Sequence, residues 1–125
     1  MMDRDTWLAC ILAAIRDLGA AAYQERVWIR AASPEVDSST EAICRLYDDF
    51  DLAGFLAQDR QRHWLPAEEH AALQTFAAAL GDYIATDDNE MSDAARVATA
   101  EWHALRNLAH RTLEVFKAPR AVSAR

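Results

Sequence analysis

The chain has 125 residues, of which 52% are hydrophobic, and this is enough for one domain whose core needs no disulfide or metal to fold. Alanine supplies much of that hydrophobic content, and Gly and Pro number only three each, so the composition favours helices over strands. Twenty acidic residues against thirteen basic ones give a formal charge of -7, which opposes binding to nucleic acid or anionic lipid and predicts a basic or neutral partner.

A first helix is predicted to begin after Asp3 or Asp5 and to run to about Gln24. Its large apolar side chains recur at intervals of three and four residues, which places them on one helical face toward a core. They are Trp7, Leu8, Ile11, Leu12, Ile15 and Leu18. Gly19 interrupts this stretch and indicates either a close approach of another helix or an early helix end.

Residues 26–30 alternate between large polar or aromatic side chains and the aliphatic side chains Val27 and Ile29. A period of two is typical of extended chain rather than of a helix. We therefore expect an extended connector near residues 26–30 that leads into a turn at Ser33 and Pro34.

A second helix is expected after Asp37, Ser38 and Ser39, whose side-chain oxygens are good N-caps. The pattern directs four of its side chains inward, those of Ile43, Leu46, Tyr47 and Phe50. A short third helix follows and ends near Gln58, with its apolar face formed by Leu52, Phe55 and Leu56.

Pro66 stands where the first residue of a helix is favoured, and acidic residues follow in the first turn. The most regular amphipathic pattern of the chain comes next, at Leu73, Phe76, Ala77, Leu80 and Ile84. A last helix is expected to start at Ser92 or near Thr99 and to end before Pro119.

These elements predict an all-α fold, a compact bundle of four to five helices with one extended connector. The single helical domain is expected over residues 1–119, with a frayed C-terminal tail over residues 120–125.

Two further features bear on the location of the protein. The apolar run from Trp7 to Ile15 does not follow the basic leader of a signal peptide, and no stretch has the length of a membrane helix. Cys10 and Cys44 each lie beside large apolar residues, so reduced, buried thiols are expected. We therefore predict a cytoplasmic protein that does not bind a membrane.

Carboxylates gather in two clusters that are the most distinctive surface feature of the sequence. The first comprises Glu35, Asp37, Glu41, Asp48, Asp49 and Asp51, and the second comprises Asp87, Asp88 and Glu90. A negative patch steers basic partners, and an exposed aromatic side chain beside it adds an anchor that is buried on binding. Trp28 and Trp64 fall in or beside predicted connectors and are the candidate anchors, whereas Trp7 and Trp102 are expected in the core. The alternative is a solvated surface that only prevents aggregation.

No catalytic or cofactor signature occurs in the sequence. His103 and His110 share one predicted helical face with Asn107 and Glu114, but the two histidines lie about 10.5 Å apart along a helix, too far to hold one metal ion. The glycines are isolated from one another, and no Ser or Cys has the surroundings of a nucleophile. We predict no catalytic residue, no metal site and no cofactor, although carboxylates that converge in the fold leave an enzyme open.

Four short runs of the chain carry a pattern that can be compared with known families: Arg26–Ile29, Pro34–Ser38, Asp48–Asp49 and Glu101–Trp102. The pattern resembles that of small all-helical bacterial proteins with no established activity, which implies a stand-alone bacterial protein and carries over no functional residue. In size and charge the chain is also similar to the immunity partners of bacterial toxins, many of which cover the active site of a basic nuclease.

The leading hypothesis is a non-enzymatic protein-interaction module, immunity- or antitoxin-like, that binds a basic partner through the acidic clusters. The second hypothesis, from another class, is a small-ligand- or metal-dependent helical enzyme built around His103, His110 and the carboxylates. The third is a structural homo-oligomer in which the alanine-rich face of the first helix packs against its copy.

Overall fold

The computed structural model describes residues 3–30, 37–86 and 91–117, and within these ranges every regular element is a helix. The first part contains α1 (Arg4–Gly19), α2 (Ala21–Tyr23), the π-helical segment η1 (Gln24–Ile29), α3 (Ser39–Cys44), the π-helical segment η2 (Arg45–Asp49) and α4 (Leu52–Arg62). The second part contains α5 (Ala67–Thr86), the short α6 (Asp93–Val97) and α7 (Ala100–Lys117). The all-α prediction is confirmed. The turn expected at Ser33 and Pro34 and the tail expected over residues 120–125 lie outside the described residues.

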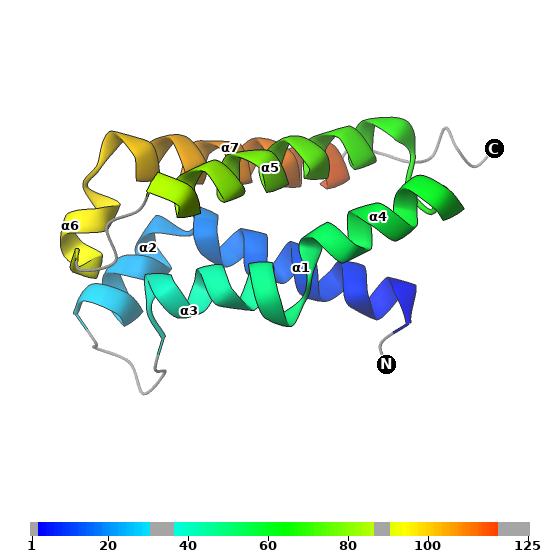
Figure 1. Ribbon diagram of the computed structural model, residues 1–125. Coiled ribbons are helices and arrows are strands. Elements are labelled where there is room, and N and C mark those ends of the chain that lie inside the picture. Colours follow the sequence, from blue (N-terminus) through cyan, green and yellow to red (C-terminus); the bar gives the residue numbers. More distant parts are fainter. Residues whose placement is uncertain (1–2, 31–36, 87–90, 118–125) are drawn as a thin grey trace.

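The helices form two layers (Figure 1). One layer consists of α5 and α7, which run antiparallel, and the other consists of α1 and the run from α3 to α4. α7 packs against both α1 and α5, and α4 packs against α5. The core between the layers is filled by fully buried side chains, among them Ile11, Ile15, Leu18, Leu46, Phe55, Leu73, Phe76, Leu80 and Trp102.

The first helix ends at Gly19 rather than near Gln24, and the chain bends by 71° between α1 and the segment Ala21–Ile29. A Cβ at Gly19 would come within 3.3 Å of Ala109 Cβ, so Gly19 marks both a helix end and a close approach to α7. Within the described residues no single helix is long and apolar enough to cross a membrane, and α1 passes that test only together with the bent segment that follows it.

One buried amide, that of Gln24, holds this bend. Gln24 Nε2 donates to the carbonyl oxygens of Asp17 and Leu18, each at 2.9 Å, and Gln24 Oε1 accepts from Trp102 Nε1 at 3.1 Å. The two donated bonds satisfy carbonyls in the last turn of α1, where the Asp17 carbonyl also accepts a long capping bond from Ala20 N at 3.4 Å. The bend and the buried tryptophan in the first turn of α7 are therefore fixed by the same side chain.

Most of the segment expected to be extended, residues 26–30, is helical instead, and Arg30 is the C-cap of that helix. Its backbone is closed by the hydrogen bonds of η1, and Val27 and Trp28 are only 3% and 7% exposed. The Trp28 ring packs edge-on against Trp102, with 5.7 Å between the ring centroids. The extended connector is therefore a wrong prediction, because burial of two adjacent side chains outweighs the local period of two in the sequence.

A helix begins at each of the two positions considered for the start of the last helix, α6 after Ser92 and α7 after Thr99. Ser92 Oγ caps α6 by accepting from Ala95 N at 3.1 Å, and Thr99 Oγ1 caps α7 by accepting from Trp102 N at 3.1 Å. Ser38 caps α3 in the same way, as its sequence position predicts.

Three side chains expected in the core reach the surface. Cys44 is exposed, Tyr47 is 51% exposed and Phe50 is half-buried. The helix changes from α to π after Cys44, so for Tyr47 and Phe50 the 3.6-residue period no longer predicts which side chains face inward. Cys44 lies before this change, at the end of α3, and is exposed there. Cys10 and Trp7 are likewise half-buried rather than buried.

Candidate functional site

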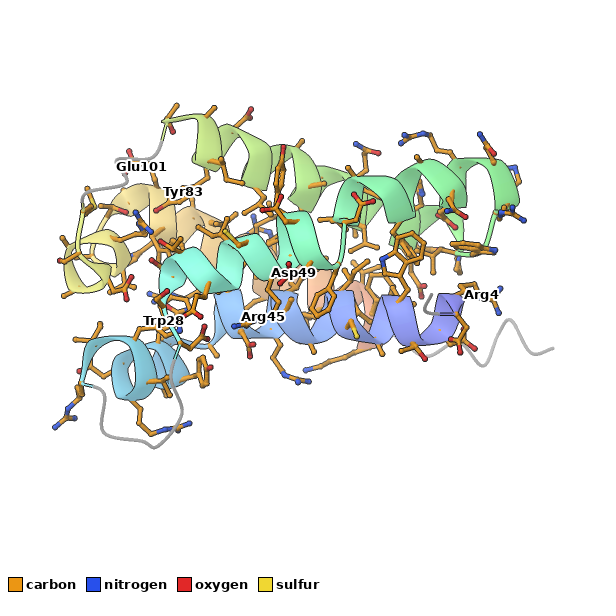
Figure 2. The ribbon with its side chains drawn as sticks, turned by 60° about the horizontal axis from the view of Figure 1, so that its bottom comes forward. Arg4, Trp28, Arg45, Asp49, Tyr83 and Glu101 are labelled. Atoms are coloured by element: carbon orange, nitrogen blue, oxygen red, sulfur yellow. The ribbon has the colours of Figure 1, made fainter. Side chains whose placement is uncertain are left out.

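An open hollow of about 370 Å³ brings together side chains from α1, η2, α4 and the turns that flank α4. We call it the aromatic cleft, and its lining comprises Arg4, Trp7, Asp49, Phe50, Asp51, Gln58, Arg62 and Trp64. Arg4 lies at the N-terminal end of α1, and Asp49 lies at the end of η2 (Figure 2). Asp49, Asp51 and Trp64, all selected from the sequence, therefore share one site.

The cleft has an aromatic floor. Trp7 packs edge-on against Phe55 with 5.1 Å between centroids and against Trp64 with 6.4 Å. Phe55 is fully buried, whereas Trp7 and Trp64 are half-buried and line the cleft. Trp7 Nε1 donates to the carbonyl oxygen of Phe50 at 2.5 Å, so the polar atom of this indole is already satisfied. The floor therefore offers mainly apolar ring surface.

The junction between η2 and α4 shapes part of the rim. Asp51 has a left-handed backbone, with a φ of 44°, and caps α4 by accepting from Gly54 N at 3.1 Å. A Cβ at Gly54 would stand 2.1 Å from Asp51 Oδ2, so glycine leaves the room that this cap needs. Asp51 thus has a structural task as well as a place in the cleft, while Asp49 is simply exposed.

A buried carboxylate fixes the turn that carries Trp64. The side chain of Asp59 is fully buried, its Oδ1 accepts from Leu65 N at 2.9 Å, and its Oδ2 lies 2.5 Å from His70 Nδ1. On the other side of Trp64, His63 ends α4 in a left-handed conformation with a φ of 53°. The backbone is therefore held on both sides of Trp64, and the indole ring packs against Trp7 and Phe55.

A further hollow of about 290 Å³ borders the same turn and is lined by His70 and Asp59 together with Arg60 and His63. A histidine oriented by a carboxylate is a component of many catalytic sites. None of the side chains lining this hollow carries a hydroxyl or a thiol, however, so the pair comes without a nucleophile. The hydrogen bond from Leu65 N to Asp59 gives this pair a structural role in holding the turn.

Asp37 belongs to a buried polar cluster rather than to the surface. Its side chain is 3% exposed, with Oδ2 accepting from Tyr23 OH at 2.8 Å and from Trp28 Nε1 at 3.1 Å, and Oδ1 accepting from Arg45 Nη2 at 2.8 Å. Burial alone would raise the pKa of Asp37, but these hydrogen bonds outweigh it and the pKa lies below the ordinary value of 3.8. Asp37 and Trp28, selected as surface residues for partner binding, are therefore buried, and the expectation that they are exposed is wrong.

The remaining acidic candidates are divided between the surface and segments outside the described residues. Asp48 is exposed on η2 but does not line the cleft. Glu35 and the whole second cluster, Asp87, Asp88 and Glu90, lie outside the described residues, and the convergence of the two clusters stays a prediction.

Five lining residues were not selected from the sequence: Arg4, Trp7, Phe50, Gln58 and Arg62. The spacing of Trp7 and Phe50 predicted core positions, and both are half-buried. No pattern in the sequence links Arg4 with Arg62, which share the cleft only because α1 packs against α4.

The histidines provide no metal centre in the described part of the chain. His103 and His110 are exposed on α7. Across residues 3–30, 37–86 and 91–117, no three His, Cys, Asp or Glu side chains lie close enough together to hold a metal ion.

Comparison of the chain with known proteins finds no match among protein-family models, curated proteins or solved structures. The resemblance of the four short runs to small bacterial proteins remains a prediction. The geometry of the aromatic cleft is therefore the basis on which a function can be proposed.

Proposed function

We propose that this chain is a non-enzymatic protein-interaction module, immunity- or antitoxin-like, whose partner inserts one large apolar side chain into the aromatic cleft. The observation that carries the proposal is the convergence of Asp49, Asp51 and Trp64 on one open hollow with an aromatic floor. Exposed carboxylates beside a partly exposed aromatic ring combine a fast encounter with a buried anchor.

The floor supports an apolar anchor. Trp7, Phe50 and Trp64 are each half-buried and each lines the cleft, so one inserted side chain would remove apolar surface of all three from water. Burial of a large apolar side chain contributes about 1.5–3 kcal/mol. A partner that exposes a Leu, Ile, Met or Phe side chain fits this floor.

The cleft is lined by two aspartates and two arginines, so its own charges balance and support binding in one register, whereas the acidic excess of the whole chain favours a basic partner. Asp49 and Asp51 can pair with a basic residue that flanks the anchor, and Arg4 and Arg62 can pair with an acidic residue elsewhere on the same segment. The formal charge of -7 adds a long-range attraction that raises the association rate of a basic partner. The overall charge therefore affects how fast a partner arrives, and the charged side chains of the cleft affect the register in which it binds.

The cleft is also largely organised in advance. The cap formed by Asp51 holds one side, and the Asp59 carboxylate holds the turn that carries Trp64. A binding site whose backbone is already ordered loses less conformational entropy when its partner binds.

The first test identifies a partner and then maps its site. The purified chain is used as bait in a lysate of its native host, bound proteins are released by rising salt and identified by mass spectrometry, and the affinity of a recovered partner is measured with purified components. Trp64→Ala is expected to weaken binding about 30-fold, which corresponds to a buried anchor worth about 2 kcal/mol. The double change Asp48→Lys with Asp49→Lys is expected to slow association about tenfold and to reduce its salt dependence.

Glu25→Lys with Glu114→Lys provides the matched control, because it makes the same double charge reversal at two exposed positions that do not line the cleft. Circular dichroism melts establish that each variant is folded. A partner whose affinity and association rate are the same for wild type, Trp64→Ala and the double variant would bind elsewhere and would overturn the proposal.

A further inference from the structure

The layer formed by α5 and α7 is hollowed along its length, on a surface that shares no residue with the aromatic cleft. One hollow of about 430 Å³ and another of about 260 Å³ are both lined by Leu108 and Arg111, so the two are continuous. Their lining on α7 extends from Glu101 to Val115, about 21 Å at the rise of an α-helix. We call this continuous surface the α5–α7 face.

The centre of the α5–α7 face is apolar and shallow. Ala79 of α5 lines it together with Ala104, Leu108 and Val115 of α7, and all four are partly or fully exposed. Small side chains on neighbouring helices leave a groove into which the ridge of another helix can pack. A groove of this length fits a helix better than it fits a small molecule.

Charged side chains stand at defined places along this groove. Asp82 of α5 and Glu101 of α7 lie at one end, where α5 ends and α7 begins, and Figure 2 shows Glu101 there beside Tyr83. Arg111 lies ten residues beyond Glu101 on α7, about 15 Å along the helix. Within the described residues no ion pair joins these three side chains to one another. Glu68 of α5 lines the opposite end of the face. The face therefore carries carboxylates at both ends, with Arg111 between them.

This charge pattern is complementary to itself in one orientation. A twofold axis that runs across the helices places α7 antiparallel over its copy, so that Arg111 of each chain faces Glu101 and Asp82 of the other. A twofold axis that runs along the helices would instead place the acidic ends on each other. Like charges face to face are destabilising, and a twofold interface requires a self-complementary surface. The first orientation gives each Arg111 acidic partners, whereas the second brings Arg111 to the same height along the helices as its own copy, so the charges favour the first orientation.

We propose that a second copy of this chain covers the α5–α7 face, in a twofold dimer whose two α7 helices cross antiparallel. Arg111 of each copy pairs with Glu101 and Asp82 of the other, and Ala104 and Leu108 pack near the axis. This interface uses α5 and α7 and is distinct from a homo-oligomer through the first helix, which stays a prediction.

Sedimentation of the full chain over about a hundredfold range of concentration tests this proposal. The wild type is expected to shift from one chain to two as concentration rises. Arg111→Glu and Glu101→Arg, each alone, are expected to raise the dissociation constant of the dimer about 100-fold, because each places like charges opposite one another. An equal mixture of the two variants is expected to regain a dimer, since the new carboxylate at position 111 then faces the new guanidinium at position 101.

Arg16→Glu is the matched control, because it makes the same substitution at an exposed position of α1 and should leave the dimer unchanged. A wild-type chain that remains monomeric throughout would overturn the proposal and leave the face to a helix of another protein. A dimer that persists equally in Arg111→Glu and Glu101→Arg would also overturn it, because the interface would lie elsewhere. None of the substituted residues lines the aromatic cleft, so the result of the dimer experiment does not depend on the proposed function.

Discussion

Asp37 and Asp49 belong to the same acidic cluster of the sequence, yet the fold gives them opposite surroundings. Asp37 is 3% exposed and accepts hydrogen bonds from Tyr23, Trp28 and Arg45, whereas Asp49 stands exposed at the rim of the aromatic cleft. The difference shows that the role of an aspartate is decided by the donors that the fold gathers around it. A carboxylate with its lone pairs occupied stabilises the fold, and an exposed one is free to attract a partner.

The tryptophans of these two regions repeat the contrast. Trp28 is buried, its ring packs against Trp102 and its Nε1 donates to Asp37. Trp64 is half-buried, and it lines the cleft on a turn that other side chains hold in place. The Trp28 ring is therefore part of the core, whereas the Trp64 ring lies at the edge of the core and is partly exposed to solvent.

Removal of the buried carboxylate is expected to have the largest effect. Asp37→Ala leaves the Tyr23 hydroxyl, the Trp28 indole nitrogen and the Arg45 guanidinium without their shared acceptor, so we expect the free energy of unfolding to fall by about 3 kcal/mol. Urea denaturation measures this change. A loss below about 0.5 kcal/mol, the size typical of a surface substitution, would remove the distinction between the two aspartates.

The Asp37 carboxylate should also affect how the free energy of unfolding depends on pH in the acidic range. Because the pKa of Asp37 in the folded chain lies below its ordinary value of 3.8, its ionised form stabilises the fold above pH 3.8, and this contribution is lost as the pH falls through the lower, folded-state pKa. The free energy of unfolding, measured by urea denaturation at a series of acidic pH values, is therefore expected to fall less steeply for Asp37→Asn than for the wild type. Equal slopes would mean that Asp37 makes no linked contribution.

The cap at the cleft rim should give a smaller, coupled effect. In the wild type, Gly54→Ala gains about 1 kcal/mol of helix propensity but displaces the Asp51 carboxylate, a cap worth about 1 kcal/mol, so we expect almost no net change. In an Asp51→Ala background the cap is already absent, and the same substitution should stabilise the chain by about 1 kcal/mol. A double-mutant cycle from urea denaturation measures the coupling, and identical effects in both backgrounds would contradict it.

Substitution of the exposed aspartate should change stability least. Asp49→Ala removes a side chain that stands exposed at the cleft rim, so its free energy of unfolding should lie within about 0.5 kcal/mol of the wild-type value. Thermal melts and urea denaturation of the two proteins make the comparison. A loss as large as that expected for Asp37→Ala would assign Asp49 to the fold rather than to the cleft.

Most helix positions could be predicted from the sequence, and the errors have local causes. Ser38, Ser92 and Thr99 cap the helices that their positions predicted, and the amphipathic pattern after Pro66 predicted α5 correctly, with Leu73, Phe76 and Leu80 buried. The prediction of an extended connector at residues 26–30 was wrong, because a local sequence pattern does not show that Trp28 is buried against another helix. The prediction that Tyr47 is buried was wrong, because a π-helical segment changes the side-chain period.

The candidate site could be predicted in part. Asp49, Asp51 and Trp64 were selected for their charge or for their position near a connector, and both features are local. Arg4 and Trp7 were missed, because their place in the cleft depends on the packing of α1 against α4.

The amino-acid sequence by itself determined the helical class, the main helix starts and the acidic character of this protein, because propensity, capping and charge act over a few neighbouring residues. Only the tertiary structure decided which carboxylates are buried and which face solvent. That choice depends on donors brought from distant helices, as Tyr23 and Arg45 are brought to Asp37, and on the packing that leaves Trp64 at the edge of the core.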